Sequence, residues 1–480
     1  MPGEEVPKTN YISVIFRKII YMKSLLNQLL VLFFTPLFFS SCKLMDKEKD
    51  NQSAVAAAST FPSWIIQSNI YEVNVRQYTP EGTFKAFEPN LQRLKNMGVD
   101  ILWFMPITPI SKADRKGTLG SYYAVEDYTN INPEFGNMDD WKALVKKAHT
   151  MGFKIIIDWV ANHTGADNHW IQTHPDFFNK DSSGKAAIPY DWSDTRDLNY
   201  WNPVLQDSMI NAMQFWLKET GIDGFRCDVA HEVPRFFWEK CIKELKQTKP
   251  DIFMLGEGDK AWMHDAGFNV TYPWDMFATM KKVAAGTKPA TALDSVLMRQ
   301  DDSFPPGAIR MYFTSNHDEN SWNKSDYATF PGEKHAPFAV FTQTMRNSLP
   351  LIYSGQEEPF LDSLSFFYKD TITWGKYQRE FFYKTLLNLR KSNSALATDA
   401  SFKKLTTGAD DKVYAYVREK DGNKVLVILN LSGDAAEAKL SDASLKGQAE
   451  NVFLGKPEDV DPSVAFKLDA WGYLVYSYKK

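Results

Sequence analysis

Cysteine is scarce in this sequence, and basic residues do not outnumber acidic ones. Three cysteines in 480 residues exclude a disulfide framework. A formal net charge of −4 argues against a nucleic-acid partner, because neutralising phosphates requires a basic surface. Past residue 60 there is no internal repeat and no low-complexity tract. Apolar side chains, at 44%, are abundant enough to bury a large core in two or three domains.

The first apolar run is too short for a confident membrane span. It begins near Met22 with a basic residue, is interrupted by Pro36, and ends at Cys42, which is typical of a secretory signal. Its end, Phe39-Ser-Ser-Cys42, resembles the lipobox of bacterial lipoproteins, whose cysteine is acylated. The resemblance implies an exported protein that is attached through lipid at Cys42 to a bacterial membrane, on its periplasmic or surface side. A plain cleaved signal or an uncleaved anchor is the alternative.

Beyond residue 60, apolar strands alternate with amphipathic helices, which favours a parallel sheet. Eight such strands predict an α/β fold, a closed (β/α)8 TIM barrel. The expected strands are 65–73, 100–105, 154–159, 223–227, 252–256, 269–272, 310–315 and 349–354. The expected helices are 90–97, 138–151, 202–220, 234–247, 289–300 and 337–348.

The domain organisation follows from changes in sequence texture. Residues 1–60 combine the leader with a charged, then Ala/Ser-rich stretch that is typical of a flexible tether. Residues 61–396 form the predicted barrel, and 161–202 are too long for a simple connection, so they predict an inserted domain beside the site. Residues 397–480 alternate apolar and polar positions between turn signals, which predicts an antiparallel β-sandwich domain.

Four of the predicted strands lead into an acidic residue, namely Asp158, Asp228, Glu257 or Asp318. Because the strands of a barrel end on one face, these acids should lie together there. Arg226, two residues before Asp228, is expected to keep that carboxyl ionised and to lower its pKa. An ionised, oriented Asp suits covalent displacement, although a structural ion pair at a strand end would explain the same two residues. Glu257 has no cation within three residues, so it is the expected proton carrier.

At these strand ends the sequence resembles the α-amylase family, glycoside hydrolase family 13. The four segments that carry the resemblance are Asp158-Trp-Val-Ala-Asn-His-Thr-Gly165, Gly224-Phe-Arg-Cys-Asp228, Leu255-Gly-Glu257 and Ser315-Asn-His-Asp318. They occur in the order of the family's signatures, and the similarity extends over about residues 61 to 480. One departure is His231-Glu232, where many α-amylases have a Lys-His pair. It weakens any transfer of acceptor preference or of a calcium contact at that place.

The resemblance implies a role for each residue of the signatures. Asp228 would be the nucleophile, Glu257 the acid/base and Asp318 the third acid, which grips sugar hydroxyls in the transition state. The residues expected to contact the sugar are Tyr123, His163, Arg226 and His317, with Tyr123 as a stacking platform. Asp158 would support Arg226 without taking part in bond cleavage. Asn162 resembles a calcium ligand, but calcium needs six to eight oxygen ligands, so no cofactor is required by the sequence.

The implied partner is an α-glucan, and no protein partner can be inferred. Cleavage of α-1,4 bonds in starch-type glucans or maltooligosaccharides is the first expectation. The segment from Asp194 to Asn199 and the run Val229-Ala-His-Glu-Val233 are similar to neopullulanase-type sequences. Neopullulanase, cyclomaltodextrinase or α-1,6-glucosidase specificity is therefore the alternative, as is a transglycosylase. An inactive glycan-binding protein is a remote alternative, because all three acids and Arg226 are present.

Overall fold

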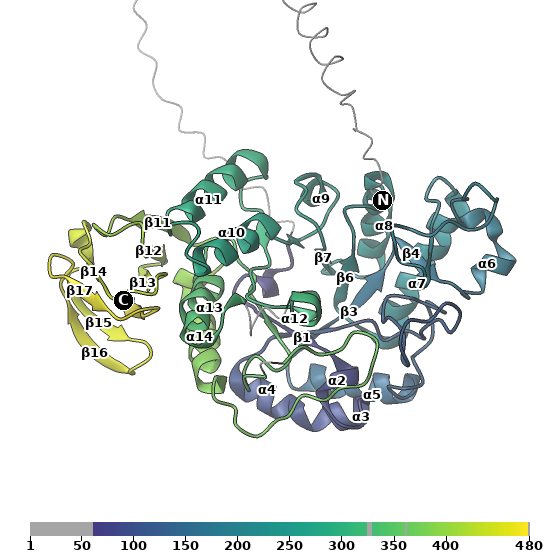
Figure 1. The fold of residues 1–480 in the computed structure, drawn as a ribbon, viewed down its shortest axis with the longest axis horizontal. Helices are drawn as coiled ribbons and strands as arrows, with labels where there is room; N and C mark the ends of the chain where they lie inside the picture. The colour runs from purple at the N-terminus through teal and green to yellow at the C-terminus, as the bar shows by residue number, and fades with distance from the viewer. Residues whose placement is uncertain (1–60, 324–328, 361, 479–480) are drawn as a thin grey trace, which may run out of the picture. The chain divides into compact units, whose positions relative to one another are not determined.

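The computed structural model describes residues 61–323, 329–360 and 362–478. Its centre is an eight-stranded parallel sheet (Figure 1). In chain order the strands are β1 (Ile70–Val73), β2 (Ile101–Phe104), β3 (Lys154–Val160), β6 (Gly224–Asp228), β7 (Phe253–Gly256), β8 (Val270–Thr271), β9 (Ile309–Arg310) and β10 (Leu351–Tyr353). In the sheet, β10 lies next to β1 and β9 lies at the other end. Backbone bonds from Leu349 N to Arg310 O and from Leu351 N to Tyr312 O join β10 to the β9 segment. The sheet closes, and the predicted (β/α)8 barrel is confirmed.

Helices follow the strands along the chain (Figure 1). They are α2 (Val75–Tyr78), α3 (Phe84–Phe87), α4 (Leu91–Met97), α5 (Met138–Thr150), α7 (Pro203–Thr220), α8 (Arg235–Thr248), α9 (Trp262–Asp265), α10 (Trp274–Ala284), α11 (Ala292–Ser303), α12 (His317–Asn323), α13 (His335–Thr344) and α14 (Glu380–Ser392). The residues at its two ends explain where α7 begins and ends. The Asn202 side chain accepts from Val204 N, Pro203 occupies the first turn, and Gly221 ends the helix at φ 69°.

The structure corrects several of the expected elements. The first strand begins at Ile70, whereas Ile65 lies in a 3-10 turn and is nevertheless buried, so apolar character alone did not distinguish the two states. Of the expected strand 310–315, only Arg310 lies in a regular strand, β9 (Ile309–Arg310). Helices α10 and α14 were not predicted, although α14 carries a clear apolar stripe that includes Tyr383, Leu386 and Leu387.

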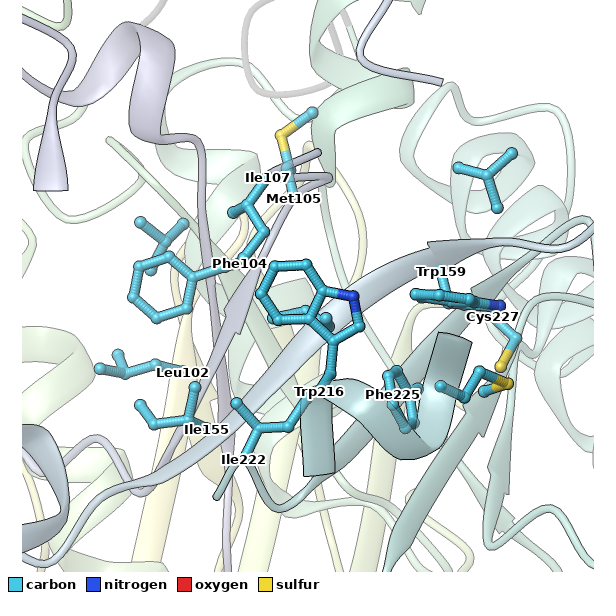
Figure 2. Packing of buried hydrophobic residues seen from close by; sticks show 14 of the residues in the cluster. Leu102, Phe104, Met105, Ile107, Ile155, Trp159, Trp216, Ile222, Phe225 and Cys227 are labelled. Carbon is cyan, nitrogen blue, oxygen red and sulfur yellow. The ribbon is translucent and has the colours of Figure 1, made fainter. Parts of the chain in front are cut away.

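The layer between barrel and helices is densely packed with aromatic side chains. Figure 2 shows Trp159 of β3 beside Phe225 and Cys227 of β6, with Trp216 of α7 nearby. The rings of Trp159 and Phe225 are 5.5 Å apart at 70°. Cys227 is a free, fully buried thiol, as expected, and burial raises its pKa well above the usual value. The outward face of β6 is therefore structural, and the inward face is left for polar groups.

The insert and the C-terminal region are also ordered. In the insert, β4 (His163–Gly165) pairs antiparallel with β5 (Thr195–Asp197), and α6 (Trp170–Thr173) lies between them in the chain. The C-terminal strands are β11 (Ser401–Leu405), β12 (Val413–Lys420), β13 (Asn423–Asn430), β14 (Ala436–Ala438), β15 (Gly447–Asn451), β16 (Lys456–Val460), β17 (Phe466–Leu468) and β18 (Tyr473–Tyr478). They form a six-stranded antiparallel sheet and a two-stranded one, β14 with β17.

Alternation along β12 explains how the C-terminal sheet is buried on both faces. Tyr414 and Tyr416 belong to a core that also contains barrel residues, whereas Val413 and Ala415 belong to a separate core within the C-terminal region. Because the barrel and the C-terminal sheet share a core, the boundary at 396/397 stays a prediction.

The predicted leader, the tether and Cys42 lie outside the described residues. Within the described ranges, the helices are all too short or too polar to cross a bilayer.

Candidate active site

The barrel strands bring the four predicted acids to one end of the sheet. In the parallel pairing of β3 and β6, Asp158 lies opposite Arg226, and Val160 lies opposite Asp228. Because side chains alternate along a strand, Arg226 and Asp228 share the inward face of β6 while Cys227 points outward. Glu257 directly follows β7, and its backbone N–H donates to Cys227 O.

Arg226 is the centre of the site. Its side chain is 0% exposed, and its guanidinium contacts three carboxylates. Nη1 lies 3.0 Å from Asp158 Oδ1 and 2.9 Å from Asp228 Oδ1, and Nη2 donates to Glu257 Oε2 at 2.7 Å. Since one planar guanidinium spans both contacts, the bonded oxygens of Asp228 and Glu257 are at most about 8 Å apart. Arg226 therefore gathers both acids in a fixed geometry.

Glu257 has no cation within three residues in the sequence, but in the structure Arg226 binds it as well as Asp228. The predicted low pKa of Asp228 was wrong. Burial raises the pKa of Asp228, and although Arg226 opposes this effect, the carboxylates of Glu257 and Asp158 add to it. The pKa lies well above the ordinary Asp value. The sequence showed the cation two residues away but not the crowding of carboxylates around it.

Backbone strain holds Glu257 in place. Val229 has φ 43°, a conformation that a β-branched residue rarely adopts. This places the N–H of Val229 2.9 Å from Glu257 Oε2, the oxygen that also accepts from Arg226. Strain of this kind costs roughly 1–3 kcal/mol and concentrates at functional sites. The segment after Asp228 is thus shaped to orient Glu257.

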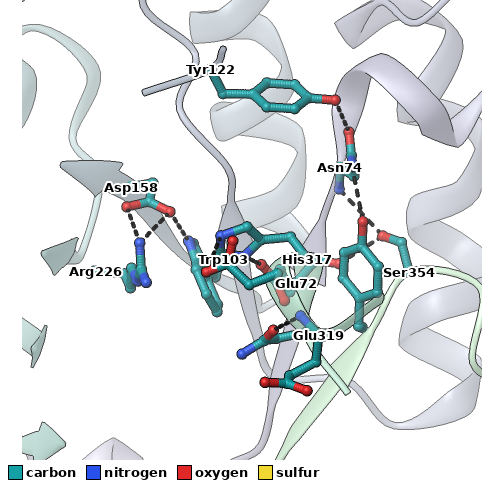
Figure 3. A network of polar contacts seen from close by, with 12 residues as sticks. Glu72, Asn74, Trp103, Tyr122, Asp158, Arg226, His317, Glu319 and Ser354 are labelled. Carbon is teal, nitrogen blue, oxygen red and sulfur yellow. Dashed lines mark hydrogen bonds and ion pairs between the residues drawn. The ribbon is translucent and has the colours of Figure 1, made fainter. Parts of the chain in front are cut away.

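His317 links Asp318 to the buried carboxylate of Glu72 on β1. Figure 3 shows the contact between His317 and Glu72. Its Nδ1 lies 2.6 Å from Glu72 Oε1, and its Nε2 lies 3.3 Å from Asp318 Oδ2. Burial opposes a charge on His317, yet Asp318 and Glu72 outweigh burial and raise the pKa of His317 well above its usual value. Burial would raise the pKa of Asp318, but His317 outweighs it and lowers that pKa. Asp318 is therefore held ionised.

Tyr123 connects the side-chain contacts of Glu72, His317 and Asp318 to the surroundings of Arg226. Its hydroxyl donates to Asp158 Oδ2 at 3.1 Å and lies 2.7 Å from His317 Nε2, so its oxygen can accept from a protonated imidazole. Its ring stacks against that of His317 at 5.4 Å and against Phe366 at 5.8 Å. Part of Tyr123 still lines the cavity described below. Its predicted role as a sugar platform stays a prediction.

A cavity of about 440 Å³ opens over the acids. Asp228, Glu257 and Asp318 line it together with Tyr123 and His163, whereas Arg226 and His317 lie behind those acids. The remaining lining residues are Lys116, Ser121, Asp191, Trp192, Asp194, Thr195, Val229, Trp322, Phe366 and Phe367. Burial lowers the pKa of His163 to about 4, so its imidazole is neutral at physiological pH. The site combines ionisable groups, neutral hydrogen-bonding groups and aromatic walls.

The sequence prediction missed three side chains that complete the network. Glu72 binds His317, Trp103 Nε1 donates to Asp158 Oδ2 at 3.3 Å, and Tyr272 OH accepts from Arg226 Nε at 3.0 Å. Glu72 could have been found, because it ends an apolar run at a strand end, as the four recognised acids do. Of the aromatic walls, Trp322 lies on the short helix α12 and Phe366 lies in a loop, and neither carries such a signal.

Asn162, the predicted calcium ligand, lines a cavity other than the one over the acids. The side-chain amide of Asn162 lies 3.3 Å from the ring of His163, and Asn162 lines a separate cavity shared with Asp197. The Asp197 carboxylate already accepts from Asn179 Nδ2 at 2.7 Å. Within the part of the chain that the structure describes, no three His, Cys, Asp or Glu side chains group to hold a metal. Calcium stays a prediction, and no chemical step below depends on it.

Comparison with known proteins agrees with this geometry. Residues 45–194 and 180–384 match the family model described as alpha amylase, catalytic domain, and residues 402–475 match that of the maltogenic amylase C-terminal domain. A cyclomaltodextrinase from a Bacillus species is 26% identical over 426 residues, covering 77% of this chain and 73% of the relative. Neopullulanase 2 from Thermoactinomyces vulgaris is 27% identical over 395 residues, covering 74% and 63%. The chain thus spans less than two thirds of this second relative.

Solved structures show the same architecture. A noncanonic maltogenic α-amylase from Thermotoga neapolitana aligns with a TM-score of 0.78 and 29% identity, covering 86% of this chain and 98% of that one. An α-amylase from Lactobacillus plantarum aligns with a TM-score of 0.77 and 29% identity, covering 86% and 99%. The acids at the strand ends thus contact one arginine on a barrel that these enzymes share. The chain belongs to the α-amylase family of glycoside hydrolases, family 13.

Proposed function

We propose that the protein is a retaining glycosidase that cleaves α-1,4-glucosidic bonds by double displacement. The observation that carries this proposal is the shared guanidinium of Arg226, which keeps Asp228 and Glu257 on one wall of the cavity within about 8 Å of each other. Retaining enzymes need their carboxyl groups roughly 5–5.5 Å apart, a separation that this arrangement permits.

In the first step, a carboxylate oxygen of Asp228 bonds to the anomeric carbon while the glycosidic C–O bond breaks. Glu257 gives its proton to the departing oxygen, which leaves as an alcohol. In the second step, water bonds to the anomeric carbon, the ester bond to Asp228 breaks, and Glu257 takes a proton from that water. Two inversions at the same carbon give overall retention.

The carboxylates outnumber the cation at the centre of the site. Asp158, Asp228 and Glu257 all contact the one guanidinium of Arg226, so it compensates their charges only in part. The raised pKa of Asp228 is one expression of that crowding. Asp228 must be ionised to act as the nucleophile, and the contact with Arg226 is the one that favours this reactive form. Asp318, held ionised by His317, is free to accept hydrogen bonds from sugar hydroxyls.

The substrate class that we propose is maltodextrins and related cyclic or branched α-glucans. Relatives named cyclomaltodextrinase, neopullulanase and maltogenic α-amylase support it, as does the match to a maltogenic amylase C-terminal domain. The aromatic walls formed by Trp192, Trp322 and Phe366 suit the flat apolar faces of sugar rings. A neopullulanase or cyclomaltodextrinase preference, an α-1,6-glucosidase, and transfer of the glycosyl group to a second sugar remain rival outcomes for the test.

Product analysis on amylose, pullulan, cyclodextrins, isomaltose and sucrose tests this proposal. The protein should release maltose or short maltodextrins from at least one α-1,4-linked substrate, with the α-anomer formed first by NMR. Asp228→Asn, which keeps the size of the side chain, should lose activity by more than about 10⁴-fold. Longer products at high substrate concentration would instead assign a transglycosylase. Wild-type inactivity on every substrate, or β-anomeric products, would overturn the proposal.

We also propose export and lipid attachment at Cys42, supported by the sequence pattern of residues 22–42 alone. In a bacterial host, Cys42→Ala should move the protein from the membrane fraction to the soluble fraction. Unchanged partitioning would argue against acylation.

A further inference from the structure

Exposed apolar side chains concentrate on one short stretch of the chain. Ile188, Tyr190, Trp201 and Val204 are all strongly exposed, with Trp201 at 79% and Tyr190 at 63%. Of the large hydrophobic side chains in the described ranges, Trp201 is the most exposed. Scattered apolar residues on a surface need no explanation, but a cluster that includes two aromatic rings marks a binding surface.

The two rings are held in position although they face solvent. The ring of Trp201 packs against Phe236 of α8, with centroids 5.1 Å apart at 42°. Tyr190 has φ 54°, which is unfavourable for a bulky residue, and its ring lies 4.8 Å from that of Trp192. Rings fixed in this way lose little conformational freedom when a ligand binds. Strain at an exposed aromatic residue is also a feature of functional segments.

A cavity of about 310 Å³ lies beside these rings, and both Tyr190 and Trp201 line it. Polar groups make up much of the rest of its wall, including Asn179, Asn199 and Glu232. Apolar ring faces flanked by amide and carboxylate groups suit a sugar, which presents flat C–H faces and a rim of hydroxyls.

Two contacts join the walls of this second cavity to the walls of the active-site cavity. Trp192 lines the active-site cavity and packs against Tyr190, which lines the second one. On the other side, Val229 lines the active-site cavity, and its carbonyl accepts from the N–H of Glu232, a wall of the second cavity. A chain lying in the active site can therefore extend along one surface towards Trp201.

We propose that the surface between Tyr190 and Trp201 binds an outlying part of the same α-glucan chain whose bond is cleaved at Asp228. The inference rests on the proposed function for the identity of the ligand. This surface, called the Tyr190–Trp201 platform below, then selects for chain length, because a short substrate fills the active-site cavity without reaching Trp201. Hydrolysis of long chains depends on the two rings, and hydrolysis of short ones does not.

The test compares Trp201→Ala and the double variant Trp201→Ala/Tyr190→Ala with wild type. Phe381→Ala is the matched control, because Phe381 is an aromatic residue that is 68% exposed on α14. We expect the KM for amylose to rise about fivefold in Trp201→Ala, and further in the double variant, with kcat/KM for maltotriose within about twofold of wild type. Retardation in an amylose-containing native gel should fall in parallel, and the control should match wild type in both assays.

The gel assay measures binding without catalysis, so it separates this inference from the proposed function. A wild-type protein that hydrolyses no glucan but is retarded by amylose would overturn the function and leave the platform to be judged on the variants. Equal losses on maltotriose and amylose, or no loss on either, would overturn the platform. A change from dimer to monomer by sedimentation, with glucan binding intact, would instead assign the two rings to a contact between copies of this chain.

Discussion

Arg226 and Arg418 are both fully buried, but their surroundings differ. Arg226 contacts the carboxylates of Asp158, Asp228 and Glu257. Burial would lower its pKa, but Asp158, Tyr272, Glu257 and Tyr123 outweigh burial and raise it. Arg418, on β12, donates to backbone carbonyls between the barrel and the C-terminal sheet, among them Thr344 O, Met345 O, Ala397 O and Ala400 O. No acid is paired with it in the described residues, and burial lowers its pKa to about 10.

The comparison shows two uses of the same side chain. Arg418 satisfies carbonyl groups that would otherwise be buried without partners, so its contribution is to stability. Arg226 holds acids at a spacing that chemistry requires, although burying several charges together is costly. Activity should therefore be sensitive at Arg226, and the free energy of unfolding should be sensitive at Arg418.

Among substitutions outside the two reacting acids, Arg226→Lys should give the largest loss of activity. A single ammonium group cannot bridge Asp228 and Glu257 as the guanidinium does, so kcat should fall by more than about 10³-fold. Steady-state hydrolysis of a maltodextrin measures the loss of activity, and a thermal melt measures any loss of stability. A kcat within tenfold of wild type would contradict the claim that Arg226 serves activity whereas Arg418 serves stability.

Asp318→Asn should give the next largest loss. The amide keeps the shape of the carboxylate but removes the charge that His317 stabilises, so contacts that strengthen in the transition state are weakened. We expect kcat to fall by about 10²-fold while KM changes by less than about threefold. A variant whose KM rises and whose kcat is unchanged would show that Asp318 only binds the ground state.

Glu72→Gln should move the alkaline limit of activity. Glu72 and Asp318 both raise the pKa of His317. Tyr123 also contacts Nε2 of His317, and the Trp103 ring lies edge-on to the imidazole, with ring centroids 5.9 Å apart. If activity requires protonated His317, it is lost as pH rises through this pKa. Removing one carboxylate lowers the pKa, so the alkaline limb of kcat should shift to lower pH by about one unit or more.

The control for this prediction is Glu358→Gln, a buried carboxyl that accepts from backbone N–H groups of Gly375, Lys376 and Tyr377. It should leave the pH profile unchanged even if it lowers the melting temperature. The stability that the His317 contacts contribute should be fully present below about pH 6.5 and should be lost as pH rises through the folded pKa. An unshifted profile in Glu72→Gln would reduce Glu72 to a packing role.

Arg418→Lys should have the smallest effect on turnover. The change leaves several buried carbonyls without a donor, which should cost about 3 kcal/mol and lower Tm by about 5 °C or more. At a temperature where the variant is folded, kcat should remain within about twofold of wild type. A melting temperature equal to that of wild type would contradict the stabilising role of Arg418.

Much of the site could be predicted because its chemistry follows strand periodicity. Asp158 and Asp228 were placed on one face because each lies at a strand end, and the pairing of β3 with β6 puts the two strand ends side by side. Glu72 was missed although it lies at the end of β1, and Trp201 was missed because exposure of a loop side chain has no local sequence signal. Helix α14 was missed although its apolar stripe is regular.

The sequence by itself determined the alternation of strands and helices, the capped ends of helices such as α7, and the acids at strand ends. These features depend on local periodicity and backbone chemistry, which act within a few residues. Only the tertiary structure decided that Arg226 serves two acids at once, that crowded carboxylates raise the pKa of Asp228, and that Glu72 stands behind His317. Electrostatic energies depend on distance and burial in space, and neither can be obtained from separation along the chain.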